Sequence, residues 1–167
     1  MIKKYPLISF IFIALLLFFT GCQAEGSYLK EEAPIQKRPS SDKGIKLSTE
    51  KAVYKTSDNE ITINIQNDSD TQFSYGQDFA IEKKVKDAWY SVPFKDKFFE
   101  EKGTLLHPKT STSQTFSLEQ LENNLSSGKY RIVVTFYNPE DYFLILKKEG
   151  NTPKGAPTLA APFKVVK

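Results

Sequence analysis

The chain has 167 residues, including one cysteine, one histidine and one tryptophan, and its 23 basic and 20 acidic residues give a formal net charge of +3. A single cysteine excludes a disulfide within the chain, and one cysteine with one histidine is too few for a zinc site. No run of lysines and arginines is longer than two residues. We therefore expect no nucleic-acid binding, which requires a clustered basic face.

Residues 1–21 have the order of a secretion signal. Lys3 and Lys4 precede an apolar run from Leu7 to Phe19, and a small residue, Gly21, follows it. The run is shorter than the about 20 apolar residues that a transmembrane helix needs. The sequence therefore predicts a leader that is cleaved before Cys22, with an uncleaved anchor as one alternative.

Cys22 gives this leader a second resemblance. Because the cysteine comes directly after the small residue, the leader resembles a bacterial lipoprotein signal. Phe19 stands where that pattern has Leu, Val or Ile. The resemblance implies that Cys22 takes a diacylglycerol and fatty acids such as palmitate. It places the protein on the extracytoplasmic face of the cell membrane, held by a lipid anchor; plain secretion is the other alternative.

Residues 22–43 predict a flexible tether. Gly26, Pro34, Pro39 and mixed charges interrupt the few apolar residues, which follow neither a helical nor a strand period. As a coil, this segment would span roughly 25 Å.

Residues 44–167 predict one antiparallel β-sandwich domain of about seven strands. The clearest alternation is that of Ile61, Ile63 and Ile65 with Thr62, Asn64 and Gln66, which gives one apolar face and one face in solvent. Phe79, Ile81 and Val85 alternate in the same way with Ala80, Glu82 and Lys84, and the strongest single strand is Tyr130–Tyr137. A helical turn or two is expected over Leu118–Leu125. The expected strands are Ile45–Thr49, Ile61–Gln66, Phe79–Val85, Trp89–Val92, Thr112–Phe116, Tyr130–Tyr137 and Pro162–Val166.

Leu125, Gly128 and Tyr130 have the Leu-x-x-Gly-x-Tyr spacing of a tyrosine corner. Together with the stretch from Asn67 to Pro93, they resemble a bacterial immunoglobulin-like domain found in secreted and lipid-anchored proteins of Gram-positive bacteria. The resemblance covers residues 45–137 and the last strand, and it departs at Asn138–Thr158. It implies an immunoglobulin-like fold and an extracytoplasmic setting, and it implies no shared chemistry.

Trp89 and Tyr90 have two interpretations. In the first, Trp89 packs on the sandwich core, as the strand-C tryptophan of immunoglobulin domains does. In the second, both rings form an aromatic platform for a sugar.

Catalytic and metal-binding residues are not expected. His107 precedes a proline in a loop, and no nucleophile motif surrounds Ser111, Thr112 or Ser113. Asp68 and Asp70, with Asn67 or Asp58, are oxygen ligands suited to calcium, but they lack the order of a calcium loop, so a turn is the favoured interpretation. Asp96, Glu100 and Glu101 alternate with lysines, as in a solvated loop.

The segment from Asn138 to Pro157 is the preferred partner surface, and Tyr142 and Phe143 are its weak candidates for binding. Its apolar run is alternatively a hairpin that fills the sandwich. The sequence therefore favours a lipid-anchored, non-catalytic binding or accessory module without a cofactor, whose partner is a protein or a cell-wall polymer. A structural spacer and, last, an extracytoplasmic hydrolase are the alternatives.

Overall fold

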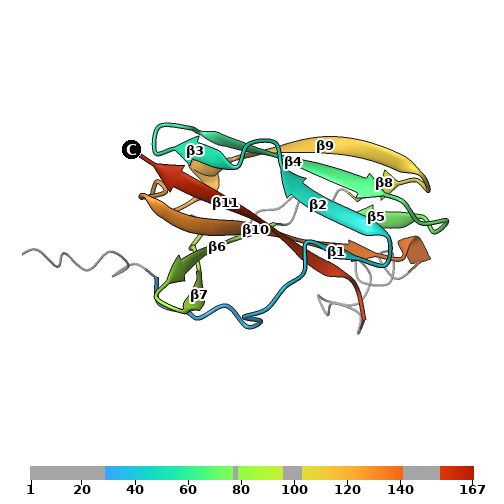
Figure 1. Cartoon of the computed structure of the whole chain (residues 1–167), viewed down its shortest axis with the longest axis horizontal. Coiled ribbons are helices and arrows are strands. Elements are labelled where there is room, and N and C mark those ends of the chain that lie inside the picture. Colours follow the sequence, from blue (N-terminus) through green and yellow to red (C-terminus); the bar gives the residue numbers. More distant parts are fainter. Residues whose placement is uncertain (1–28, 77–78, 96–102, 141–154) are drawn as a thin grey trace, which may run out of the picture.

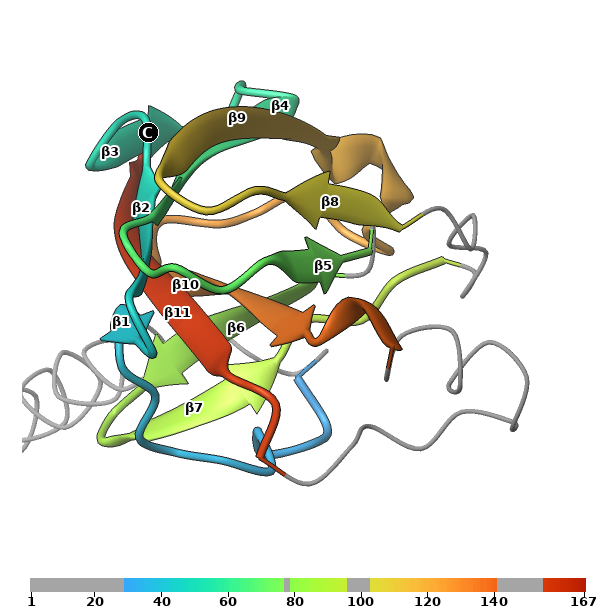
Figure 2. The ribbon, with the colours of Figure 1, turned by 90° about the vertical axis from the view of Figure 1, so that its right-hand side faces the viewer.

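The computed structural model describes residues 29–76, 79–95, 103–140 and 155–167. Over these ranges the chain forms two β-sheets that face each other (Figures 1 and 2). The expected antiparallel β-sandwich is therefore confirmed. No helix among the described residues is long and apolar enough to cross a bilayer.

The first sheet has the strand order β1-β2-β4-β9 and is antiparallel throughout. A tight turn at Lys43 and Gly44 joins its first two strands, and both residues have positive φ, as such hairpins require. Its strands are β1 (Ser41–Asp42), β2 (Ile45–Thr49), β4 (Glu60–Asn67) and β9 (Thr110–Ser117).

The second sheet has the order β3-β11-β10-β5-β8, and β6 pairs with β10 and with β7. All its pairs are antiparallel except β3 with β11. Its strands are β3 (Val53–Lys55), β5 (Phe73–Tyr75), β6 (Ala80–Val85), β7 (Ala88–Ser91), β8 (Thr104–Leu106), β10 (Gly128–Tyr137) and β11 (Thr158–Val166).

The core lies between the sheets and follows the predicted alternation. From the first sheet, Ile61, Ile63 and Ile65 on β4 are fully buried. From the second, alternate residues of β10 enter the core, beginning with Tyr130. The Tyr130 hydroxyl donates to the Ser126 carbonyl over 2.8 Å, which confirms the tyrosine corner. Between the strands, η1 (Leu118–Gln120) supplies a single helical turn.

All seven expected strands are present, and four short ones, β1, β3, β5 and β8, were not anticipated. The last strand begins at Thr158 rather than at Pro162, so Pro162 lies within it. The amides of Ala160 and Lys164, two residues before and after it, point to the side of β11 away from β10: Ala160 N donates to Pro39 O, and Lys164 N donates to Ala52 O. By the same alternation position 162 faces this side and not β10, so the missing N–H of Pro162 breaks no hydrogen bond between β10 and β11.

Residues 29–40, named the strap here, differ most from expectation. The structure packs them on the second sheet, so the predicted tether is wrong for this part; residues 22–28 lie outside the described ranges. Leu29 and Ala33 are buried, Ser91 N donates to Glu31 O, and Ala33 N donates to Trp89 O. Figure 2 shows the strap beneath β7 and β11, on the side away from β4 and β9.

Candidate functional site

The strap explains why the outer face of the second sheet buries charge. Glu82 on β6 and Arg131 on β10 are 2% and 4% exposed, and their side chains form an ion pair through Arg131 Nε. Arg131 also donates to the strap carbonyls of Ile35 at 2.7 Å and Gln36 at 2.9 Å. Sequence alternation placed Glu82 in solvent, and it missed the strap that covers it.

Trp89 lies on this outer face and not in the sandwich core, so the core interpretation is wrong. The guanidinium carbon of Arg131 is 4.4 Å from its ring centroid, and the Lys84 ammonium nitrogen is 6.0 Å from it. Tyr90 packs against the core instead, and Glu32 raises the pKa of its phenol. Since consecutive strand residues point to opposite faces, the two rings do not form one platform.

The first sheet carries a different outer face, made mainly of uncharged polar side chains in register. Ser48, Asn64 and Ser113 form one cross-strand row, and Thr62 pairs with Thr115 in the next. Ser113 Oγ donates to Asn64 Oδ1 at 2.7 Å, and the hydroxyl oxygens of Thr62 and Thr115 are 2.8 Å apart. We call this surface the polar face.

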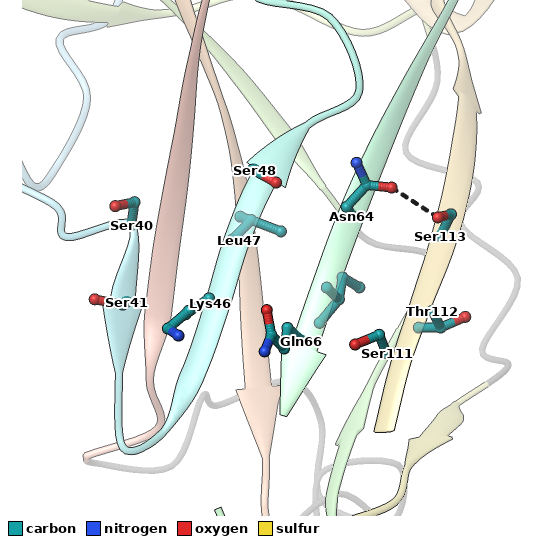
Figure 3. A pocket seen from close by; sticks show the side chains of 11 residues that line it. Ser40, Ser41, Lys46, Leu47, Ser48, Asn64, Gln66, Ser111, Thr112 and Ser113 are labelled. Carbon is teal, nitrogen blue, oxygen red and sulfur yellow. Dashed lines mark hydrogen bonds between the residues drawn. The ribbon is translucent and has the colours of Figure 1, made fainter. Parts of the chain in front are cut away.

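A hollow of about 550 Å³ lies on the polar face, between β1 and β9 (Figure 3). Figure 3 shows Ser48, Asn64 and Gln66 on β2 and β4 beside Ser111 and Ser113 on β9. The described lining has one charged residue, Lys46, whose ammonium contacts Asp68 at 2.8 Å. Hydrogen bonds from Lys46 and then Gln66 hold the pKa of the Asp68 carboxyl below its usual value.

The calcium alternative does not fit this turn. Asp68 binds Lys46, and Asp70 binds Lys109 over 3.1 Å, so lysines already neutralise both carboxylates. Asn67 is fully buried, accepts from Ser69 N, and donates to the carbonyls of Thr71 and His107. The favoured interpretation, a turn held by Asn67, is confirmed.

The other predicted residues do not form a reactive cluster. His107 is exposed, and its Nδ1 lies 3.4 Å from the Gln72 amide. Over the described ranges, no three histidine, cysteine or acidic side chains lie together as a metal site would require. Cys22, Tyr142, Phe143, Asp96, Glu100 and Glu101 lie outside the described residues.

Sequence reasoning assigned Thr62, Asn64 and Gln66 to the solvent side of a strand, but it did not predict the polar face. The matching hydroxyls come from β9, which is 43 residues beyond the end of β4 in the chain. The alternation of each strand was readable, whereas the register between them depends on the intervening loops.

Solved structures with some likeness come from several organisms. The chaperone DraB of E. coli is 13% identical, with a TM-score of 0.43 over 72% of this chain and 52% of that one. The complex of the SafA pilin with the SafB chaperone of Salmonella enterica gives 11% identity and a TM-score of 0.41, covering 77% and 56%. The ASH/PapD-like domain of human CEP192 is 12% identical, with a TM-score of 0.37 over 80% of this chain and 89% of that one. The chain spans about half the length of DraB.

No curated protein matches this chain. The model of one protein family, described as the bacterial Ig-like domain, matches residues 41–152. The match continues past Tyr137, where we expected the resemblance to depart, and it ends before β11. Because it covers more than half of the residues, and the two facing sheets agree with it, the chain belongs to the bacterial Ig-like domain family.

Proposed function

We propose that this chain is a lipid-anchored, extracytoplasmic binding module without catalytic machinery of its own, and that its ligand is a hydroxyl-rich polymer of the cell wall. The observation that supports binding is the polar face, with its in-register rows of hydroxyl and amide groups. The membership of the Ig-like family is consistent with a module that binds rather than reacts.

The chemistry of the polar face suits an uncharged polymer. Hydroxyl and amide groups both donate and accept hydrogen bonds, as sugar hydroxyls do. Cross-strand bonds such as Asn64–Ser113 restrict these short side chains before a ligand arrives, which lowers the entropy lost on binding. A strand surface also presents its rows at a fixed spacing, which favours an extended, repeating partner.

The anchor is the second part of the proposal. If Cys22 carries the lipid, six residues separate it from Leu29, the first packed residue of the strap. A fully extended link of this length reaches at most about 25 Å. As a coil, the same link would span roughly 15 Å, against roughly 25 Å for a tether ending at residue 43. The sandwich would therefore lie closer to the membrane than the sequence predicted.

Binding is tested with the mature chain and purified, insoluble cell-wall polymer in a co-sedimentation assay. Ser113→Arg places a long cation in the middle of the polar face and should abolish retention. Ser57→Arg is the matched control, because Ser57 is exposed and lies outside the polar face. Failure of the wild-type chain to bind would favour the structural spacer, and release of soluble products would favour the hydrolase.

The anchor has its own test. Mass spectrometry of the protein from membranes should find a diacylglyceryl group on an amino-terminal Cys22, and Cys22→Ser should move the protein into the soluble fraction. An unmodified thiol at the mature end would contradict lipidation and leave the binding experiment unaffected.

A further inference from the structure

The outer face of the second sheet carries three lysines in one cross-strand row. Lys164 on β11 lies opposite Lys129 on β10, which lies opposite Lys84 on β6. All three are exposed. Like charges placed directly opposite one another destabilise a sheet, so folding alone does not favour this row. An anionic partner would relieve the repulsion.

Beside this row, a hollow of about 520 Å³ lies between the strap and the sheet, and Lys37, Arg38, Arg131 and Trp89 contribute to its lining. Arg38 and Arg131 share a single carboxylate, Glu82, whose oxygen is 3.6 Å from Arg38 Nε. Two guanidinium groups against one buried acid leave a positive charge unbalanced.

Arg38 has a buried donor in this hollow that makes no hydrogen bond within the described ranges. Its side chain is 9% exposed, and its Nε has no hydrogen-bond partner among the residues that the structure describes. Its contact with Glu82 is an ion pair at 3.6 Å, too long for a good hydrogen bond. A buried donor without a hydrogen bond is costly, and an oxyanion is the chemical group that satisfies a guanidinium best.

The two outer faces of the sandwich therefore differ in charge. On the outer face of the second sheet, together with the part of the strap that covers it, six basic side chains lie around one buried acid, Glu82. The strap also carries the exposed residues Lys30, Glu31 and Glu32, and Glu32 contacts the Tyr90 hydroxyl. The polar face has one lysine, already paired with Asp68. The six basic residues are Lys37, Arg38, Lys84, Lys129, Arg131 and Lys164; we call them the basic face.

We infer that the basic face docks on the phosphate groups of anionic phospholipids, with one phosphate oxyanion bound at Arg38. This inference rests on the proposed lipid anchor, because the strap that begins seven residues after Cys22 runs over this same face. Basic clusters act together with lipid chains to hold proteins at anionic membranes. The polar face, on the opposite sheet, then points away from the bilayer.

The docking is tested on a chain without the lipid anchor, so that a failure of docking can be told apart from a failure of the anchor proposal. The probe is a vesicle of phosphatidylglycerol and phosphatidylcholine, mixed with residues 22–167 carrying Cys22→Ser; every described core residue lies at or after Leu29. Co-sedimentation measures the affinity. Trp89 is the only tryptophan in the chain and lines the Arg38 hollow, so its fluorescence reports on that site.

The chain that carries only Cys22→Ser should bind these vesicles and dissociate from them as the salt concentration is raised. It should not bind vesicles of pure phosphatidylcholine. Replacing Lys84, Lys129 and Lys164 together by Gln should weaken binding by about a hundredfold, since each basic residue near an anionic surface contributes about fivefold. The control replaces Lys46, Lys51 and Lys109 by Gln, with the same change in net charge, and should bind within about threefold of wild type.

Arg38→Gln should remove the vesicle-dependent change of Trp89 fluorescence. Equal losses in both lysine triples would overturn the inference, because net charge alone would then explain binding. A saturable response of Trp89 to inorganic phosphate, without binding to vesicles, would overturn the lipid as the source of the phosphate. No response to either probe would overturn the site itself.

Discussion

At the scale of single residues, Tyr130 is the clearest agreement between sequence and structure. Tyr130 is fully buried, stacks on Phe163 with ring centroids 5.6 Å apart, and donates its hydroxyl to Ser126 O. Tyr130→Phe should lower the free energy of unfolding by about 1–2 kcal/mol, because it removes the hydrogen bond that the buried phenol donates to the part-buried Ser126 carbonyl. Urea unfolding measures the change. Tyr90→Phe, which removes an exposed hydroxyl, is the control and should leave stability nearly unchanged.

Glu82 gives a second prediction at this scale. Glu82→Gln leaves Arg38 and Arg131 beneath the strap without a counter-charge, which should cost about 3–5 kcal/mol of unfolding free energy. Adding Arg38→Gln to this variant should recover part of the loss, because one of the two guanidinium groups is then gone. A double variant no more stable than Glu82→Gln alone would contradict the shared-carboxylate arrangement.

These two residues show what a single sequence discloses. Tyr130 was predictable because the signal is local: six consecutive residues contain the leucine, the glycine and the tyrosine that make the corner. Glu82 and Trp89 were not, because their surroundings come from Arg131 and from a strap about 50 residues earlier. A charged residue in an alternating strand indicates solvent unless a distant segment covers it.

At the scale of elements, the strap is the main departure from the sequence. Its composition resembles a linker, and it forms only an isolated bridge between Glu32 and Tyr90. It is held by backbone bonds to β7, by the buried side chains of Leu29 and Ala33, and by Arg131. Backbone bonds of this kind do not depend on side-chain pattern, which is why periodicity could not reveal them.

The strap should open separately from the sandwich. Ala33→Arg places a long cation where the side chain is 4% exposed, so hydrogen exchange of the Ser91 amide should accelerate by about tenfold or more. The amide of Ile63, in the core, should keep its protection. Ile35→Arg is the matched control on the same segment, because Ile35 is 51% exposed. If both variants accelerate Ser91 equally, the burial of Ala33 is not what holds the strap.

At the scale of the whole molecule, the seven longer strands were predictable because their alternation repeats over several residues. The short β3, β5 and β8, with three residues each, carry too little alternation to be detected. Their positions are fixed by pairing: β3 with β11, β5 with β10, and β8 with β5. The composition of the two outer faces depends on the register between strands, so the sequence could not predict that one face is basic and the other mainly uncharged.

The buried phenols make stability depend on pH. Burial raises the pKa of Tyr54 and Tyr75 above the ordinary value of 10.0. The folded state therefore favours the neutral phenol, so this stabilisation is fully present below about pH 10 and is lost as the pH rises through the raised pKa. Thermal unfolding should show Tm falling on the alkaline side, with a shallower fall in Tyr75→Phe. An equal slope in that variant would exclude Tyr75 as a contributor.

The orientation of the two faces is tested most directly on the lipidated protein in vesicles, with one label on each face. Cys22 is the only native cysteine, and the proposed lipid would block its thiol. Pro162→Cys on the second sheet and Ser113→Cys on the polar face can then each be labelled alone. Lipids with a nitroxide headgroup should quench a fluorophore at residue 162 strongly and leave one at residue 113 bright. Equal quenching at both positions, or stronger quenching at residue 113, would contradict the account.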